Sequence, residues 1–352
     1  MRFFHIADVH LGAEPDKGFP WSQDRSWEIW DSFRRVIEQA GQDHADLFLI
    51  AGDLFHRQPL ARELKEVNAM FSSIPDTKIL LIAGNHDYLR KDSLYTRFSW
   101  SPNVYGLWSQ EITHVDFPDL GVRVTGCSYK SREISRPLYD TLKKSGEMPV
   151  EILLAHGGDE KHIPISRDRL AASGFDYIAL GHIHKPQVLQ TDQMIYAGSL
   201  EPTEKNDTGP HGFVKGEIRN GKVRTVFVPW AAREYKELKV PVTRETTQYT
   251  LRQKISGLLE EKGKEHIYTL ILQGERNPET EFQLSQLYSL GNIRQVEDQS
   301  RPAWSLEELC RKHRGSLLEE YIRSFGEDPG EEEKKALDYG IRALLETGEE
   351  IL

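Results

Sequence analysis

The sequence predicts an α/β protein with a large first domain, a small α+β region and a helical tail. From residue 1 to residue 228, short apolar segments alternate with amphipathic stretches, a pattern typical of βαβ units with parallel strands. The central apolar segments are unbroken, as expected for strands that are covered on both faces. Around residues 230–235 the pattern changes, which indicates that a second domain begins there.

The first region contains the clearest strand and helix patterns. The candidate strands are short apolar runs at residues 2–7, 47–51, 79–83, 122–126, 151–155, 177–180, 194–197, 213–218 and 223–228. The candidate helices have apolar residues on one face and lie at residues 24–40, 60–71, 137–144 and 167–172. The last strands follow one another without helices between them, so we expect antiparallel hairpins in that part.

The second region repeats the alternation on a smaller scale. After a first strand, residues 236–297 hold a candidate helix at 246–262, a strand at 267–272, a helix at 278–290 and a strand at 292–296. The tail beyond Pro302 is helical and strongly charged, with a break at residues 326–330. We therefore expect three domains, at residues 1–233, 234–300 and 301–352.

Composition excludes several classes of protein. No apolar run approaches the roughly 18 residues that a membrane span needs, and His5 and Asp8 interrupt any signal-peptide core. The two cysteines, Cys127 and Cys310, argue against a disulfide framework. We expect a cytoplasmic protein that does not bind membranes. Its net charge is −10, and residues 301–352 contain 13 Asp and Glu against 8 Lys and Arg, so the tail is a poor DNA-binding arm.

Residue types that bind metal ions follow five of the predicted strands. In chain order these groups are Asp8-Val9-His10, Gly52-Asp53, Gly84-Asn85-His86-Asp87, His156-Gly157 and Gly181-His182-Ile183-His184. Ligands of an open parallel sheet bind at the carboxyl ends of its strands, so we expect all five groups at one sheet edge. In extended chain, a spacing of two would put Asp8 and His10 on the same side. Alone, the Asp-x-His, Gly-Asp and single-histidine groups are more typical of a loop, a turn or a buried structural histidine, and the other two groups fit a structural or a metal-binding role equally well. Five in succession indicate a metal site.

This series of motifs resembles the calcineurin-like metallophosphoesterase superfamily, whose blocks are Asp-x-His, Gly-Asp, Gly-Asn-His-Asp/Glu, His and Gly-His-x-His. The resemblance covers residues 1–228 and implies a layered α/β/β/α sandwich that holds two adjacent divalent metal ions. It implies that one ion is bound by Asp8, His10 and His184, that the other is bound by Asn85, His156 and His182, and that Asp53 bridges the two.

The chemistry of this donor set agrees with the implied assignment. Imidazoles, carboxylates and an amide, without a thiolate, suit manganese, iron or zinc better than calcium or magnesium, and we expect manganese. Two dications and two carboxylates leave a formal charge of +2, which suits an anionic phosphoryl substrate. Two ions about 3.5–4 Å apart can hold a nucleophilic hydroxide and clamp the phosphoryl oxygens during in-line attack.

Two further histidines are candidate catalytic residues. His86 follows Asn85 in sequence and is suited to stabilise or protonate the leaving oxygen; Asp87 either orients His86 or caps the loop at the surface. Residues 52–59, GDLFHRQP, are similar to a segment of SbcD-type DNA nucleases. In part of that group a histidine three residues after the bridging aspartate assists cleavage, so the resemblance implies this role for His56, with a polar helix-start residue as the alternative.

The SbcD-type resemblance also implies partners. These nuclease subunits carry a capping domain, which residues 236–297 fit, and then helices that bind an SMC-type coiled-coil ATPase. Apolar residues form two stripes in the tail, at Leu317, Leu318, Tyr321, Ile322 and Phe325 and at Leu337, Ile341, Leu344 and Leu345. The stripes either bind an SbcC-like ATPase or pack on the cap of the chain itself. The YhaO-like subgroup is similar in length and tail character.

The resemblance therefore implies a DNA nuclease, an exonuclease or endonuclease that acts in DNA repair. Basic residues near the third motif and in residues 128–146 fit a DNA footprint or a solvated surface: Arg90, Lys91, Lys130, Arg132, Arg136, Lys143 and Lys144. Two alternatives stay open. The chain is either a phosphoesterase for cyclic nucleotides, phosphomonoesters or lipid head groups, or a non-catalytic subunit of an ATPase complex. A homodimer is also left open.

Overall fold

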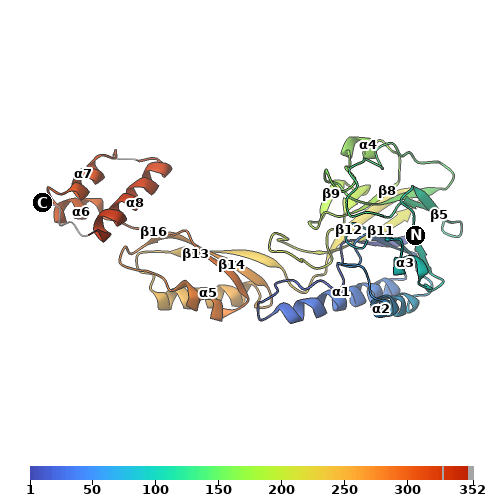
Figure 1. The fold of residues 1–352 in the computed structure, drawn as a ribbon, viewed down its shortest axis with the longest axis horizontal. Coiled ribbons are helices and arrows are strands. Elements are labelled where there is room, and N and C mark those ends of the chain that lie inside the picture. The colour runs from blue at the N-terminus through green and yellow to red at the C-terminus, as the bar shows by residue number, and fades with distance from the viewer. Residues whose placement is uncertain (327–328, 348–352) are drawn as a thin grey trace. The chain divides into compact units, whose positions relative to one another are not determined.

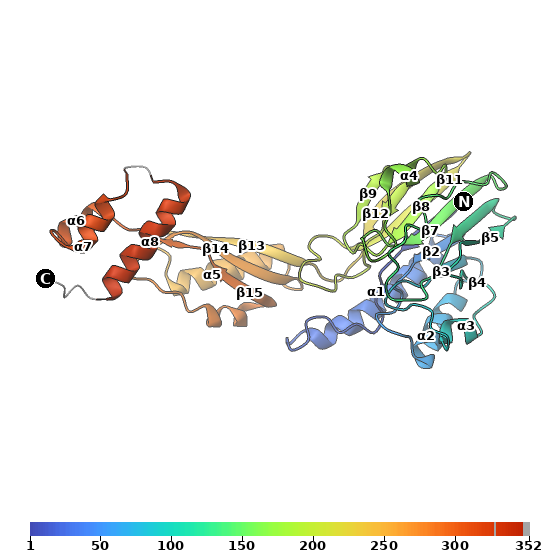
Figure 2. The ribbon, with the colours of Figure 1, turned by 45° about the horizontal axis from the view of Figure 1, so that its top comes forward.

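Two sheets, each of six strands, form the centre of the first of the two units into which the chain divides, Met1–Tyr235 and Lys236–Leu352. The structure is a computed structural model that describes residues 1–326 and 329–347 (Figures 1 and 2). The first sheet has the order β12 (Lys222–Pro229), β11 (Gly212–Arg219), β1 (Arg2–Ile6), β2 (Leu47–Ala51), β3 (Lys78–Ile82) and β4 (Val104–Gly106). The second has the order β5 (Thr113–Phe117), β6 (Val122–Gly126), β7 (Val150–His156), β8 (Tyr177–Gly181), β10 (Met194–Tyr196) and β9 (Gln187–Gln190).

Three apolar layers hold the first unit together. The core between the two sheets contains Phe3, Leu49 and Leu80 from one sheet and Ile152 and Ala179 from the other. A second core joins the outer face of the first sheet to α1 (Ser22–Gln42) and α2 (Ala61–Ser72), which lie side by side on that face (Figure 2). A third core covers the outer face of the second sheet with loops and the short α4 (Arg167–Ala171). The predicted layered α/β sandwich is confirmed.

Strand register brings the ends of the strands into line. β1, β2 and β3 are parallel, with Ile6 opposite Ile50 and Ile50 opposite Leu81. In the second sheet β7 and β8 are parallel, and His156 lies opposite Gly181. The residues that follow each strand therefore leave their sheet at the same level. The expected antiparallel hairpin is present as β11 and β12.

The helix predicted at residues 137–144 is wrong. These residues form turns and irregular chain, because their side chains are engaged by distant segments. Tyr139 is fully buried, and its hydroxyl lies 3.4 Å from the backbone nitrogen of His156. The Asp140 carboxylate accepts a hydrogen bond from Ser166 N at 2.9 Å. Tertiary contacts of this kind outweigh the helical pattern of a short segment. The structure also adds α3 (Leu94–Arg97), β4, β5 and β9, which the sequence pattern did not predict.

His5 makes the stability of the fold depend on pH. It is fully buried in β1, with Nδ1 2.9 Å from the Tyr177 hydroxyl, and burial lowers the pKa of His5 to about 3. Below pH 6.5 the unfolded chain takes up a proton that the folded chain refuses, so the free energy of unfolding falls as the pH decreases toward 3. We expect a loss from this group of up to about 1.4 kcal/mol per pH unit.

Urea unfolding at pH 7.5, 6.5 and 5.5 measures this loss. His5→Gln should remove the contribution of His5 from the pH dependence, whereas His114→Gln, at an exposed position in β5, should leave it unchanged. Equal pH dependence in the wild type and in His5→Gln would contradict the prediction.

The second unit begins with a small sheet and one long helix. β14 (Ile267–Arg276) lies between β13 (Tyr235–Val242) and β15 (Ile293–Asp298) and also pairs with β16 (Arg301–Pro302). The helix α5 (Gln248–Lys262) packs its buried residues, Leu251, Ile255 and Leu259, into the core of this sheet. The predicted strands at 267–272 and 292–296 and the helix at 246–262 are confirmed, each within a few residues.

The helix predicted at residues 278–290 is wrong. Only two short 3-10 turns form there, Leu284–Gln286 and Tyr288–Leu290. Side chains of α5 bond the backbone groups that a continuous helix would pair internally. Gln248 accepts from Gln283 N at 3.0 Å, and the Arg252 guanidinium donates to Gln286 O at 2.7 Å.

The tail is helical, as predicted, with α6 (Leu306–Lys312), α7 (Leu317–Arg323) and α8 (Glu331–Glu346). Residues from both predicted apolar stripes pack against each other, with Leu318, Ile322, Leu337 and Ile341 buried in one cluster. Part of the predicted break, Glu327 and Asp328, lies outside the described residues. The division of this unit at residues 300 and 301 stays a prediction. No helix in the described part of the chain is long and apolar enough to cross a bilayer.

Candidate metal centre

Strand ends from both sheets supply the predicted metal ligands. Asp8, Asp53 and Asn85 follow β1, β2 and β3 of the first sheet, whereas His156 ends β7 and His182 follows β8 of the second. The expectation that all five motifs lie at one sheet edge is therefore wrong. The two sheets face each other, and the residues meet where the strand ends of both sheets come together.

The backbone at four of these positions is left-handed rather than extended. Asp8, His10, Asp53 and His182 have φ angles of 49°, 53°, 49° and 98°. Such angles are uncommon outside glycine and persist only where the surrounding structure holds them. The extended geometry predicted for Asp8-Val9-His10 is thus wrong. The turn is held by backbone hydrogen bonds from Asp8 N to Gly52 O at 3.1 Å and from His10 N to Asp53 O at 3.0 Å.

The first subsite combines Asp8, His10 and His184. Nε2 of His10 lies 3.1 Å from Nε2 of His184, and ligand atoms of all three residues lie within 4.8 Å of one another. Burial raises the pKa of Asp8 to about 6 and lowers that of His10 well below its usual value. Burial opposes a charge on His184 as well, but Asp207, Asp8 and Asp53 raise its pKa to about 9.

The second subsite combines Asn85, His156 and His182. Asn85 Oδ1 lies 2.9 Å from His156 Nε2 and 3.1 Å from His182 Nδ1. Asp53 Oδ2 lies 3.4 Å from the same His156 nitrogen, which puts this carboxylate beside the second subsite. Burial lowers the pKa of His182 to about 4. Burial opposes a charge on His156 as well, but Asp53, Asp8 and the Ala51 carbonyl together raise its pKa to about 9.

Hydrogen bonds on the far side of each imidazole fix which nitrogen faces the centre. Nδ1 of His156 lies 2.8 Å from the Ala51 carbonyl. Nε2 of His182 lies 2.7 Å from the Asp159 carboxylate. Nδ1 of His184 lies 3.2 Å from the Asp207 carboxylate. Since these oxygens only accept, the outer nitrogens carry the protons. When the rings are neutral, as metal binding requires, the inner nitrogens present lone pairs, the arrangement that orients histidine metal ligands.

The inner atoms fit a cation. The lone pair of His156 Nε2 faces two acceptors, Asn85 Oδ1 and Asp53 Oδ2, and the lone pair of His182 Nδ1 faces Asn85 Oδ1 as well. Acceptors packed this closely in a buried site repel one another unless a proton or a metal ion lies between them. Nitrogen and oxygen donors without thiolate match manganese, iron or zinc. The seven predicted ligands therefore converge, and their metal-binding role stays a prediction.

Glycine is required next to the centre. A Cβ atom at Gly84, two residues after the end of β3, would collide with the carboxylate and the backbone nitrogen of Asp53. The close approach of the two loops lets the His86 backbone nitrogen donate to Asp53 Oδ1 at 2.9 Å. Gly84 thus permits the contact that aims the Asp53 carboxylate.

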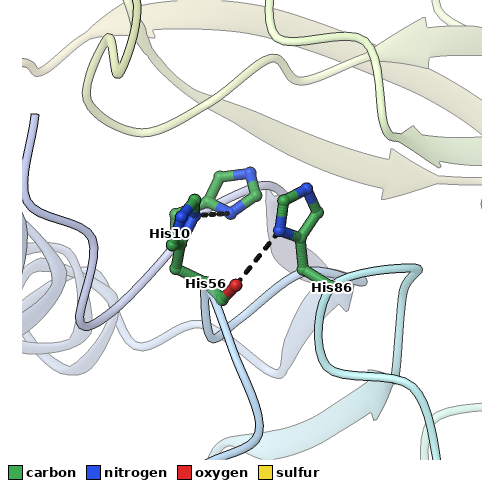
Figure 3. A group of neighbouring side chains, drawn as sticks. All are labelled: His10, His56 and His86. Carbon is green, nitrogen blue, oxygen red and sulfur yellow. Dashed lines mark hydrogen bonds between the residues drawn. The ribbon is translucent and has the colours of Figure 1, made fainter. Parts of the chain in front are cut away.

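Three histidine rings meet at the rim of the centre (Figure 3). Nδ1 of His56 lies 3.4 Å from Nδ1 of His10, and Nδ1 of His86 lies 3.1 Å from the His56 carbonyl oxygen. The ring of His86 lies 4.8 Å from that of His10 and 5.0 Å from that of His56, between centroids. His56 is exposed and His86 half-buried, so both reach solvent beside the buried ligands. His56 therefore contacts a predicted ligand directly, on the side away from the His184 nitrogen.

Asp87 has neither of the roles expected for it. It is fully buried, so it is no surface cap, and its carboxylate bonds backbone groups and a tyrosine rather than His86. Its carboxylate accepts from Gly84 N at 2.8 Å, from Phe55 N at 3.1 Å and from the Tyr95 hydroxyl at 2.6 Å. Burial raises the pKa of Asp87 to about 7. Asp87 joins the loop after β3 to the loop after β2 and so positions both motifs.

The carboxylates of Asp159 and Asp207 are site residues that sequence reasoning missed. Asp159 accepts from His162 as well as His182, and Asp207 also accepts from Thr203 N at 3.0 Å. Neither lies in one of the strand-end motifs. The only sequence signal that could have pointed to Asp159 is its position three residues after His156. For Asp207 there was no comparable signal.

Comparison with known proteins identifies the fold family. The family model described as calcineurin-like phosphoesterase matches residues 1–186. The uncharacterized metallophosphoesterase YhaO of Bacillus subtilis is 29% identical over 300 residues, which cover 78% of this chain and 72% of YhaO. The DNA double-strand break repair protein Mre11 of Archaeoglobus fulgidus is 28% identical, over 68% of this chain and 61% of that protein. Mre11 of Methanocaldococcus jannaschii is 27% identical, over 59% of this chain and 58% of that protein. The chain thus spans less than two thirds of each Mre11 protein.

Proposed function

Because the chain belongs to the calcineurin-like phosphoesterase family, whose members use two divalent metal ions, we propose that it is a two-metal phosphodiesterase that cleaves DNA. The observation that carries the proposal is the convergence of seven nitrogen and oxygen donors from two sheets, with imidazoles already oriented by outer acceptors. Asp8, His10 and His184 would hold one ion, Asn85, His156 and His182 the other, and Asp53 would bridge them. The ions would supply a hydroxide at neutral pH and a positive charge for the phosphoryl oxygens.

The chain's own residues complete the reaction. His86 stands at the rim with its ring next to His10, and it would donate a proton to the oxygen that leaves the phosphorus. His56 would hold the His10 ring through the contact between their Nδ1 atoms, so that Nε2 of His10 faces the centre. Asp159 and Asp207 would keep His182 and His184 in the tautomers that bind metal.

DNA is the proposed substrate for two reasons. Two relatives carry the name DNA double-strand break repair protein, and exposed cations lie close in sequence to the His86 motif. Arg90 and Lys91 are exposed, and the Arg90 guanidinium lies over the Tyr88 ring at 5.5 Å. By contrast, Lys143 donates to Ala172 O and Lys144 bonds Asp176, so both already serve the fold. Contacts of Arg90 and Lys91 with phosphates would make binding weaken as salt rises.

A cleavage assay with matched substrates tests the proposal. The metal-depleted chain is supplied with manganese and given end-labelled duplex DNA, single-stranded DNA, a chromogenic phosphodiester and a chromogenic phosphomonoester. We expect DNA cleavage that manganese restores and EDTA abolishes, with iron or zinc less effective. Hydrolysis of the small substrates without cleavage of DNA would contradict the DNA assignment and favour a small-molecule phosphoesterase. If none of the substrates is cleaved, with or without an SbcC-like ATPase, the proposal that the chain is an enzyme would be contradicted.

Replacing His86 by alanine separates proton transfer from metal binding. We expect DNA cleavage to fall by about 100- to 10,000-fold, the usual contribution of a general acid. The metal content, measured by mass spectrometry of the purified protein, should stay at the wild-type level, because His86 is not among the proposed ligands. A variant that loses its metal would show that His86 is a ligand and that the proposed role is wrong.

We further propose an SbcC-like SMC-type ATPase as the partner of the tail. Leu317 is 62% exposed, so α7 presents apolar surface besides the core that it shares with α8. Co-purification of the chain with such an ATPase, lost in a Leu317→Ser variant and kept in Lys312→Ser, would support the proposal. Cytoplasmic location and a homodimer stay predictions.

A further inference from the structure

A cavity of about 500 Å³ lies in the second unit, well within the size range of small-molecule sites. The ends of β14 and β16 supply Arg276 and Arg301, and α8 supplies Lys335, Tyr339 and Arg342. The α8 residues are spaced four and three apart, so they share one helix face. The shared cavity lining places that helix beside the ends of β14 and β16, and Figure 1 shows α8 next to β16. None of the proposed metal ligands lines this cavity.

The lining carries an excess of positive charge. The four cations face two carboxylates, Asp298 and Asp338, which leaves a formal charge of +2. Both carboxylates already accept hydrogen bonds from neutral donors. Asp298 Oδ1 accepts from Ser300 N at 2.9 Å, and Asp338 Oδ1 accepts from the Trp304 indole at 2.8 Å. Within the cavity lining, two carboxylates can neutralise only two of the four cations.

Arg276 is the buried member of this set. It is 8% exposed, and among the described residues its Nε has no hydrogen-bond partner. Of the residues that the structure describes, Asp298 has the carboxylate oxygen closest to this Nε, its Oδ2 at 4.0 Å, which is too far for a hydrogen bond. A buried guanidinium nitrogen without a hydrogen-bond partner lowers the stability of the fold. An oxyanion offers several acceptor oxygens, so it can bind more than one N–H group of the same guanidinium. The charge and the buried donor both point to an anionic ligand with more than one oxygen.

Tyr339 narrows the class of ligand. Its ring is 73% exposed at the same cavity, on the helix face that presents Lys335 and Arg342. An exposed aromatic ring next to phosphate-binding cations is the combination that binds nucleotides, because the ring stacks on a base and the cations hold the phosphate. We propose that this cavity binds a nucleotide through its terminal phosphate, with the phosphate against Arg276 and Arg342 and the base against Tyr339. The phosphate belongs either to a free mononucleotide or to the end of a DNA strand.

Calorimetric titration of the full chain with dAMP in EDTA tests this site, since EDTA removes ions from the metal centre. We expect one dAMP per chain, and binding weakened about 10-fold or more in Arg342→Gln, which loses a charge-assisted contact. Tyr339→Leu should weaken binding about 5-fold or more through lost stacking. Lys239→Gln, at an exposed lysine of β13 in the same unit, should bind like the wild type. Lys335→Gln, at an exposed position, serves as a second variant if Arg342→Gln does not fold.

Further titrations identify whether the phosphate belongs to a free nucleotide or to a DNA end. Adenosine should not bind, and Asp53→Asn should bind dAMP as the wild type does. An oligonucleotide with a 5′-phosphate that competes with dAMP would assign the site to strand ends, and failure to compete would assign it to free nucleotides. The proposal is overturned if dAMP does not bind at millimolar concentration, if adenosine binds equally well, or if Arg342→Gln and Lys335→Gln fold and bind with wild-type affinity. None of these outcomes depends on whether the metal centre cleaves DNA.

Discussion

Replacing Asp53 by asparagine will reduce manganese-dependent DNA cleavage by about 1000-fold or more, equivalent to about 4 kcal/mol of activation free energy. The side chain keeps its size, so the new amide still fits beside His156 Nε2 and His86 N. What is lost is the negative charge proposed to bridge the two ions. Initial rates on end-labelled DNA measure the effect, and mass spectrometry measures the metal content.

Asp119→Asn is the matched control for this substitution. Asp119 is an exposed carboxylate that approaches Lys78 at 3.7 Å, and no proposed ligand contacts it. We expect wild-type cleavage from it. If Asp53→Asn folds, as judged by circular dichroism, and cleaves DNA as fast as the control, the two-metal mechanism is wrong.

Replacing Arg25 by methionine will lower the free energy of unfolding by about 3–5 kcal/mol, the usual cost of breaking a buried ion pair from one side. Arg25 is fully buried in α1. Its guanidinium lies 2.5 Å from Glu28 and 3.3 Å from Glu201, and it donates to Pro202 O at 2.6 Å. Burial lowers the pKa of Arg25, but Glu201 and Glu28 raise it above its usual value, so the charge persists. Removal of Arg25 leaves Glu201 buried without its cation.

Urea unfolding at pH 7.5 measures the loss, with Arg34→Met as the control. Arg34 lies on the same helix, 46% exposed, and pairs with Asp31 and Glu38. Exposed pairs contribute at most about 1 kcal/mol, so the control should lose little. If the two variants lose equal free energies of unfolding, the buried ion pairs of Arg25 contribute no more to stability than the exposed pairs of Arg34.

The sequence could predict where the candidate site lies because the proposed ligands occupy fixed positions relative to apolar strands. Asp53 directly follows the run Leu47–Ala51 and its glycine, and the position of such a run is visible in sequence. The left-handed turn at Asp8 and His10 is different. Spacing reveals which residues are two apart, but the φ angles depend on bonds to Gly52 and Asp53, more than 40 positions away. No local pattern carries that information.

The same limit explains the errors outside the ligands. Residues 278–290 have an apolar pattern that fits a helix, yet Gln248 and Arg252 of α5 bond their backbone. Asp207 is an ordinary loop carboxylate until the fold brings it to His184, 23 residues earlier. Asp87 sits inside a motif, and only its burial with Tyr95 shows that it joins two loops. Contacts between distant segments decide all three.

Because the proposed ligands come from two sheets, the centre can be complete only late in synthesis. His10 and His184 are 174 residues apart in sequence, and both sheets must be in place before their nitrogens meet. A chain that is still emerging from the ribosome has Asp8, His10, Asp53 and Asn85 long before it has His182 and His184. It therefore carries no complete centre until about half of its length has been made. The proposed enzyme would therefore be inactive in every form that stops before His184, and any damage that separates the two sheets would inactivate it as well.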